Sequence, residues 1–174
     1  MKQRQLSAKT IALLAMMIAL AIVFSYVESL IPINFGIPGV KLGLANLVIV
    51  ATLYLMGGRQ ALIVSVVRII LSGLLFGNMF SILYSLAGGL LSLGIMVLIK
   101  RTDKVSVITV SVMGGIFHNI GQLIVAMIVI ENLNLVFYLP VLLLSGFLTG
   151  LVIGIVSRLI LPRIKRVFPE QANS

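Results

Sequence analysis

Long apolar runs alternate along this chain with short breaks that hold charged residues, glycine or proline. The runs occupy residues 9–30, 41–56, 61–76, 79–99, 105–130 and 137–161. About 20 apolar residues in an α-helix cross the roughly 30 Å hydrocarbon core of a membrane. The pattern therefore predicts an all-α integral membrane protein with about six transmembrane helices. The second and third runs are short, which favours internal, tightly packed helices.

The composition leads to the same fold class. Hydrophobic residues make up 60% of the 174 residues and charged residues 10%, and the mean hydropathy is +1.24. A soluble domain of this length has too little interior to hide that much apolar surface. The length fits a single membrane domain, residues 1–174, without a separate soluble module. The chain has no cysteine, which excludes disulfides and thiolate metal sites, and we expect no metal or other cofactor.

Basic residues gather at one set of predicted helix ends. The chain has 13 Lys and Arg against four acidic residues. The ends that we predict to be cytoplasmic carry Lys2, Arg4, Lys9, Arg59, Lys100, Arg101, Lys104, Arg158, Arg163, Lys165 and Arg166. The opposite ends carry only Lys41. Because cytoplasmic loops are enriched in Lys and Arg, this asymmetry predicts that both termini are cytoplasmic. It also accounts for the high isoelectric point better than a nucleic-acid-binding surface does.

Small residues recur on one face of three predicted helices, at spacings that let helix backbones approach closely. The three stripes are Ala8, Ala12, Ala15 and Ala19; Ser81, Ser85, Gly88 and Ser92; and Gly146, Gly150, Gly154 and Ser157. Packing between helices of the same chain is the expected role of such stripes. The alanine stripe has an alternative role, because it lies in the cytoplasmic half of the first helix, where a membrane partner subunit could dock.

Arg68 lies near the middle of the run 61–76. A charge at this depth is costly and is by default a candidate functional site. Among the four acidic residues, only Glu28 lies at a plausible membrane depth. Two interpretations follow: Arg68 forms a salt bridge with Glu28, or it binds an anion that the protein does not supply. Ser65 and Ser72 share its helix face.

Other polar side chains extend this candidate site. They are Lys41, Asn46, Asn78, Tyr84, His118, Asn119 and Gln122. Taken singly, such residues often only join membrane helices. Together with Arg68 they predict a cavity that binds an anionic or phosphorylated molecule, which arginine recognises through its planar set of donors. The aromatic residues of the outer half either form an interfacial belt or line that cavity; they are Phe24, Tyr26, Phe35, Phe76, Phe80, Tyr84, Phe137 and Tyr138.

Five short motifs resemble one bacterial membrane-protein family over nearly the whole chain. They are PGVKLGLAN at 38–46, LLFGN at 74–78, SLAGG at 85–89, HNIGQ at 118–122 and YLP at 138–140. The family is called Gx transporter, or heptaprenyl diphosphate synthase component I. The resemblance implies the fold of the substrate-binding S-components of energy-coupling factor (ECF) vitamin transporters, located in the bacterial cell membrane. It also implies that Ala8, Ala12, Ala15 and Ala19 contact a transmembrane coupling subunit, which two cytoplasmic ATPases energise. Flavins, or quinone and isoprenoid precursors, are the substrates that it suggests.

The residues themselves limit the alternatives. The chain has no P-loop motif, so it cannot hydrolyse ATP alone. Prenyl diphosphate chemistry needs clustered carboxylates to hold magnesium, and the chain has a single aspartate, Asp103. We therefore expect no enzymatic activity. A noncatalytic membrane component of a prenyl diphosphate synthase and a stand-alone small-molecule carrier remain as alternatives to the importer subunit.

Overall fold

The structure is a computed structural model that describes residues 8–31, 43–102 and 104–167. These residues form helices only: α1 (Ala8–Leu30), α2 (Leu44–Leu55), α3 (Gly58–Phe76), α4 (Met79–Lys100), α5 (Val107–Val129), the short 3-10 helix η1 (Leu133–Tyr138) and α6 (Leu139–Val167). The prediction of an all-α fold with six helices is confirmed. By length and composition, α1, α3, α4, α5 and the η1–α6 segment are long and apolar enough to cross a membrane. The chain is thus a multi-pass membrane protein.

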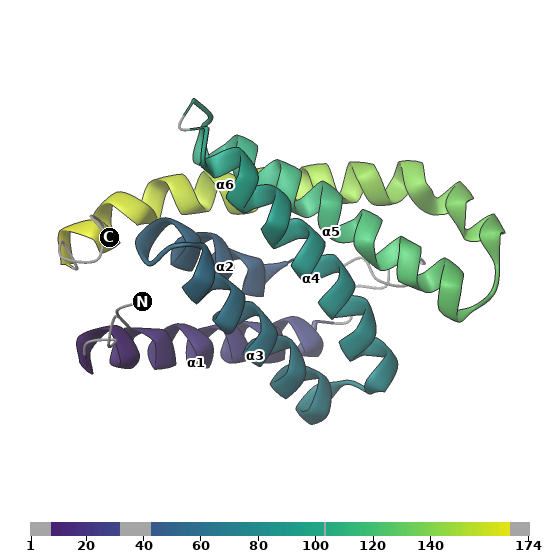
Figure 1. Cartoon of the computed structure of the whole chain (residues 1–174), viewed down its shortest axis with the longest axis horizontal. Coiled ribbons are helices and arrows are strands. Elements are labelled where there is room, and N and C mark those ends of the chain that lie inside the picture. Colours follow the sequence, from purple (N-terminus) through teal and green to yellow (C-terminus); the bar gives the residue numbers. More distant parts are fainter. Residues whose placement is uncertain (1–7, 32–42, 103, 168–174) are drawn as a thin grey trace, which may run out of the picture.

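The helices form a bundle in which both described chain ends lie at the same end (Figure 1). Helices α5 and α6 run along one side, α1 runs along the other, and α3 and α4 slant between them. The connections α2–α3 and α4–α5 lie toward the end that holds the termini, whereas the α3–α4 and α5–α6 connections lie toward the opposite end. Successive connections therefore lie at alternate ends of the bundle, as the predicted orientation requires. The orientation itself stays a prediction.

Helix α2 is internal, as predicted from its length. Most of its residues are buried, and they occupy most of the circumference of the helix: Ala45, Val48, Ile49, Val50, Ala51, Thr52, Leu53 and Leu55. A helix that is apolar all round is stable when other helices surround it, and α2 packs against α1, α3 and α6. With 12 residues it is about 18 Å long, much shorter than the hydrocarbon core. Residues 44–55 therefore do not form a full span, and the expected span 41–56 is corrected.

The end of α2 is held by a neighbouring helix. Lys100, the last residue of α4, donates from Nζ to the carbonyl of Leu53 at 2.7 Å. Its ammonium also lies 5.0 Å from the centre of the Tyr54 ring. A cation at a helix C-terminus compensates the partial negative charge of the last carbonyl groups. The contact explains how α2 ends inside the bundle.

Two other expected spans differ from the structure. Helix α3 begins at Gly58 rather than residue 61 and has 19 residues; Leu62, Ile70 and Leu74 on one side are exposed, so it is a full-length span and is not internal. Helix α6 continues through Pro162 to Val167 instead of ending at residue 161. A proline removes one backbone hydrogen bond but leaves φ helical, and the basic last turn of α6 suits a helix C-terminus.

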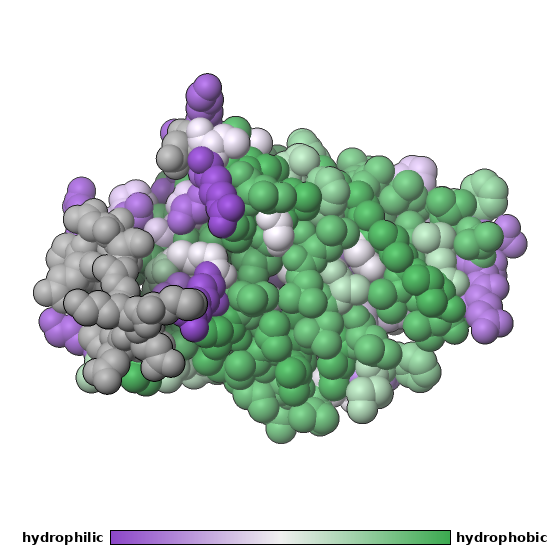
Figure 2. Space-filling view, viewed as in Figure 1, coloured by the Kyte–Doolittle hydropathy of each residue, from purple (hydrophilic) through white to green (hydrophobic). Residues whose placement is uncertain are grey.

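The surface is divided by polarity along the bundle. A broad hydrophobic zone separates a polar region at the end with the termini from a smaller polar patch at the opposite end (Figure 2). The first region includes the exposed Arg101 and Lys104, and the second includes Glu131, Asn132 and Asn134. Such a zone is the surface that a lipid bilayer covers.

Candidate functional site

A polar cavity of about 370 Å³ opens among the helices in the half of the bundle away from the termini. All six α-helices contribute to its wall. Its polar side chains are Ser25, Glu28 and Ser29 from α1, Asn46 from α2, Arg68 and Ser72 from α3, Ser81 and Ser85 from α4, His118, Asn119 and Gln122 from α5, and Thr149 from α6. Small-molecule sites in proteins have volumes of about 300–1,000 Å³. The cavity is large enough for one small molecule.

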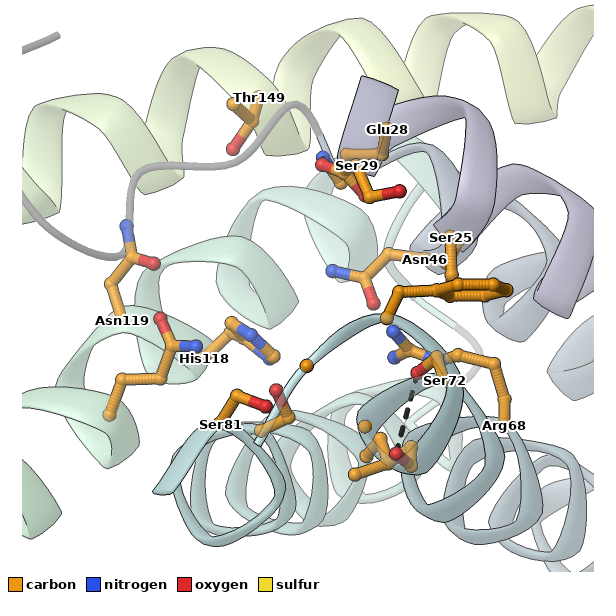
Figure 3. Close-up of a pocket in the computed structure, with 18 of the residues that line it drawn as sticks. Ser25, Glu28, Ser29, Asn46, Arg68, Ser72, Ser81, His118, Asn119 and Thr149 are labelled. Atoms are coloured by element: carbon orange, nitrogen blue, oxygen red, sulfur yellow. Dashed lines mark hydrogen bonds between the residues drawn. The ribbon is translucent and has the colours of Figure 1, made fainter. Parts of the chain in front are cut away.

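The cavity brings together most of the predicted site residues. Asn46, Arg68, His118, Asn119 and Gln122 come from three different helices and all face it. In Figure 3, Arg68 and Asn46 lie on one side of the cavity, with His118 and Asn119 across from them. The predicted cluster is thus a single site in space, with a charged side and an amide-rich side.

Two predicted members do not line the cavity, and a third is not described. Asn78 and Tyr84 are not among the described residues that line this cavity. Asn78 instead caps α4: its Oδ1 accepts from the backbone N–H of Ser81 at 2.8 Å, and the Ser81 hydroxyl accepts from the N–H of Asn78 at 3.0 Å. This reciprocal pair satisfies backbone groups at the start of the helix. Lys41 lies outside the described residues.

Arg68 enters the cavity from α3 with an incompletely bonded guanidinium. Its Nε is buried and has no hydrogen-bond partner. Among the described residues, no carboxylate oxygen lies within 4.0 Å of a guanidinium nitrogen of Arg68, the distance that defines an ion pair. Figure 3 shows the side chain directed into the cavity on the side where Ser72 lies. The Ser72 hydroxyl does not bond the guanidinium but donates to the carbonyl of Ile69 at 3.4 Å.

Glu28 faces the same cavity but has a different partner. One of its carboxylate oxygens accepts the backbone N–H of Gly43 at 2.6 Å. Gly43 precedes α2 and has a left-handed φ of 73°, a conformation that suits glycine because it lacks a Cβ. Glu28 therefore anchors the start of α2. Of the two interpretations of Arg68, the salt bridge with Glu28 is not formed in this structure.

The amides of α5 form the opposite wall. The Nδ2 group of Asn119 donates to the carbonyl of Leu142 in α6 at 2.7 Å. Gln122 lies one turn further on and is buried, and none of its polar atoms forms a hydrogen bond within the described part of the chain. His118 begins the same turn. The fold thus ties down one amide and leaves the other facing the cavity.

Close packing of α4 against α5 fixes the position of this wall. A Cβ on Gly88 would lie 2.7 Å from the carbonyl oxygen of His118 and 2.8 Å from Cγ of Gln122. A Cβ on Gly121 would lie 2.8 Å from the carbonyl oxygen of Ala87. Only glycine permits approaches this close. The two helices therefore hold the Gln122 stem in one place.

Phe76 is the aromatic residue that lines the cavity within the described part of the chain. Its ring centre is 5.0 Å from that of Tyr26, which places an aromatic pair between α1 and the end of α3. Phe80 and Phe137 are largely exposed, as expected of rings at a membrane interface. Both interpretations of the aromatic residues therefore apply, each to different residues. Phe35 lies outside the described residues.

The small-residue stripes have different environments. Gly146, Gly150 and Gly154 of α6 are buried, and a Cβ on any of them would lie within 3 Å of α5 atoms. Their predicted packing role is confirmed. By contrast, Ala8, Ala12, Ala15 and Ala19 are all exposed, while α1 packs into the bundle through Leu13, Met17 and Ala21 on its opposite face. Nothing within the described part of the chain covers the alanine stripe.

Several cavity residues were not predicted from the sequence as site residues. Ser25, Ser81, Ser85 and Thr149 all line the cavity. Ser81 and Ser85 belong to a stripe that we assigned to packing. The stripe gave no separate signal for a site, because hydroxyl groups occur at both of its ends, at Ser81 and at Ser92. Ser25 and Thr149 donate to carbonyl groups of their own helices, a common state of membrane hydroxyls that gives no sequence signal.

The family comparison covers most of the chain. The model of the family described as heptaprenyl diphosphate synthase component I matches residues 17–160. The chain belongs to this family. No curated protein and no solved structure matches it. The matched segment of this family member includes every polar residue of the cavity wall and ends within α6.

Proposed function

We propose that the chain is the substrate-binding membrane subunit of an ECF-type ABC importer, which captures a small anionic molecule from outside the bacterial cell. The observation that carries this proposal is Arg68, whose guanidinium enters a polar cavity without a carboxylate partner among the described residues. An intramembrane charge of this kind is retained where a ligand or a water-filled cavity stabilises it. The planar donor group of arginine suits a carboxylate or a phosphate.

The location of the cavity supports capture from outside. The cavity lies in the half of the bundle away from the termini, and the excess of Lys and Arg at the other end predicts that the termini are cytoplasmic. The volume of about 370 Å³ suits a vitamin- or cofactor-like molecule, such as a flavin or a quinone or isoprenoid precursor. Arg68 would hold the anionic group, and Asn46, His118, Asn119 and Gln122 would hold the rest.

Energy for uptake would come from other subunits. The chain lacks a P-loop. The carboxylate that lines the cavity, Glu28, lies in the last turn of α1 and accepts the N–H of Gly43, so the chain has no carboxylate in the middle of a span to carry a coupling proton or sodium ion. The proposed partners are a transmembrane coupling subunit and two cytoplasmic ATPases. The exposed stripe Ala8, Ala12, Ala15 and Ala19 supports a helix contact with the coupling subunit, because small residues let two membrane helices approach closely.

The family description favours a second candidate function. It names a component of heptaprenyl diphosphate synthase, so the chain would be a membrane component of that enzyme. We propose no catalytic role in that case either, since the four acidic residues of the chain are spread over residues 28, 103, 131 and 170. A magnesium-dependent diphosphate reaction needs several carboxylates in one place.

Affinity purification of the full chain from the membranes of its own cells separates these functions. Recovery of two ATPases together with a membrane coupling protein is the expected result. Substituting Ala12 and Ala15 by leucine should remove these partners, whereas the control Val152→Leu, at an exposed position of α6, should retain them. Recovery of a soluble prenyltransferase without ATPases would support the synthase component instead. Uptake by the chain alone in liposomes would indicate a stand-alone carrier.

A further inference from the structure

Gln122 is a polar side chain of the cavity that is buried without a hydrogen bond in the described structure. It is only 7% exposed, yet its amide has no hydrogen bond within the described part of the chain. Its amide oxygen and nitrogen are not fully enclosed by protein atoms. Because Gln122 lines the cavity, a molecule in the cavity can reach both atoms. Buried amides are normally bonded. A side chain with this burial and orientation is therefore available to a cavity occupant.

Asn119 limits what that occupant can be. Its Nδ2 donates to the Leu142 carbonyl at 2.7 Å, and a carbonyl only accepts, so the orientation of this amide is fixed. The Oδ1 atom remains for the cavity as a pure acceptor, one helical turn from Gln122. Gln122 can both donate and accept. The wall therefore presents an acceptor beside a donor–acceptor pair.

The wall is also preorganised. Gly88 of α4 approaches the Gln122 stem so closely that a Cβ there would lie 2.8 Å from its Cγ. The stem thus has little freedom to turn away from the cavity, so a bound molecule would have to order only the terminal amide. Arg68 enters from the side of the cavity opposite Asn119 (Figure 3). A single occupant can contact both sides.

We propose that Gln122 and Asn119 form a specificity subsite for the cis-amide edge of a planar heterocycle, such as a lactam or an imide, whose anionic group Arg68 binds. A ring N–H would donate to one of the two amide oxygens, and the adjacent ring carbonyl would accept from Gln122. Simple acids and isoprenoid chains lack such an edge and cannot pair with both the Gln122 amide and the Oδ1 atom of Asn119. The inference rests on the proposed function and narrows its substrate class to heterocyclic anions.

Two matched sets of probes test the subsite with the purified full chain in nanodiscs. Orotate joins an imide edge to a carboxylate, uracil lacks the carboxylate, and benzoate lacks the imide. The second set places the two groups further apart: uridine monophosphate carries the imide edge and a phosphate, uridine lacks the phosphate, and ribose phosphate lacks the imide. Equilibrium binding should show at least one of orotate and uridine monophosphate bound about tenfold or more tightly than both of its partial analogues. No such preference in either set would overturn the proposal.

Substitutions then assign the contribution of each side of the cavity. Gln122→Leu should weaken binding of the preferred probe to the level of its analogue without an imide, and leave that analogue unchanged. Arg68→Met should weaken the same probe to the level of the uncharged analogue. If Gln122→Leu has no effect, or weakens the analogue equally, the subsite is wrong. If Arg68→Met alone has no effect, the proposed anion site fails while the amide subsite stands.

A stability measurement covers the case in which Gln122 only supports the fold. Gln122→Leu replaces an unbonded amide by an apolar group of similar size, so the melting temperature should be unchanged or higher. Asn119→Leu breaks the bond to Leu142 and should lower it. Gln122→Leu that lowers the melting temperature as much as Asn119→Leu would show a structural role and overturn the subsite.

Discussion

At the scale of single residues, Arg68 and Glu28 are two opposite charges that share a cavity without pairing. The carboxylate of Glu28 accepts the N–H of Gly43, while Arg68 has no ion-pair partner within residues 8–31, 43–102 and 104–167. The sequence was sufficient to select Arg68, because a charge in an apolar run is visible without a structure. It could not select the partner of Glu28, since that depends on the left-handed turn at Gly43, which sets the position of one backbone N–H.

This difference predicts opposite effects of the two charges on stability. Glu28→Ala should destabilise the fold by about 1–3 kcal/mol, because the N–H of Gly43 loses its acceptor. Arg68→Met removes an incompletely bonded cation, so the free energy of unfolding should stay the same or rise. Glu28→Gln, which keeps an acceptor oxygen, is the matched control and should be milder than Glu28→Ala. Thermal unfolding in one detergent measures all three. Equal destabilisation by Arg68→Met and Glu28→Ala would instead indicate a structural charge pair.

At the scale of helices, the sequence predicted their number and most boundaries, because hydrophobic length is a strong signal in membranes. It did not reveal that α2 has only 12 residues or that α6 continues past Pro162. These boundaries depend on tertiary contacts, such as that of Lys100 with Leu53. The stripes of small residues were equally visible in α1 and α6, but their spacing does not say whether another helix covers them. Only packing distinguishes the covered glycines from the exposed alanines.

The close contact of α5 and α6 predicts a strong position dependence of alanine substitution. A Cβ at Gly150 would lie 2.7 Å from the carbonyl oxygen of Ser111 and from Cα of Val112, both backbone atoms that cannot move aside independently. Gly150→Ala should therefore destabilise the protein by about 1–3 kcal/mol. Gly94→Ala is the matched control, since nothing lies within 4 Å of its Cβ. It should be neutral or slightly stabilising, because alanine favours the helix. Equal melting temperatures of the two variants would contradict this packing.

At the scale of the whole molecule, the two ends of the bundle differ in charge and in their distance from the cavity. The two polar ends differ in composition, since the α4–α5 connection carries Arg101 and Lys104 and the α5–α6 connection at the opposite end carries Glu131. The cavity lies nearer to the second end. The sequence predicts an orientation, which stays a prediction, but it does not predict the shape of the cavity, because that shape depends on how six helices come together. Ser25 and Thr149, far apart in the sequence, meet there only through packing.

The predicted orientation is testable because the chain has no native cysteine. Asn134→Cys lies in η1 and Thr102→Cys follows α4, and both positions are exposed. A membrane-impermeant maleimide added to intact cells should label Asn134→Cys but not Thr102→Cys, because the second faces the cytoplasm. Both should react after the cells are lysed. Labelling of Thr102→Cys in intact cells would show that the orientation is opposite to the predicted one. The cavity would then open toward the cytoplasmic side.

The central claim is that the cavity binds a small anion through Arg68. The most direct measurement is native mass spectrometry of the purified chain, after incubation in nanodiscs with a small-molecule extract of its own cells. Wild type and Arg68→Met are compared under the same conditions. We predict that wild type retains one bound small molecule that Arg68→Met does not retain. Equal retention by both proteins, or no bound small molecule on the wild type, would contradict the claim.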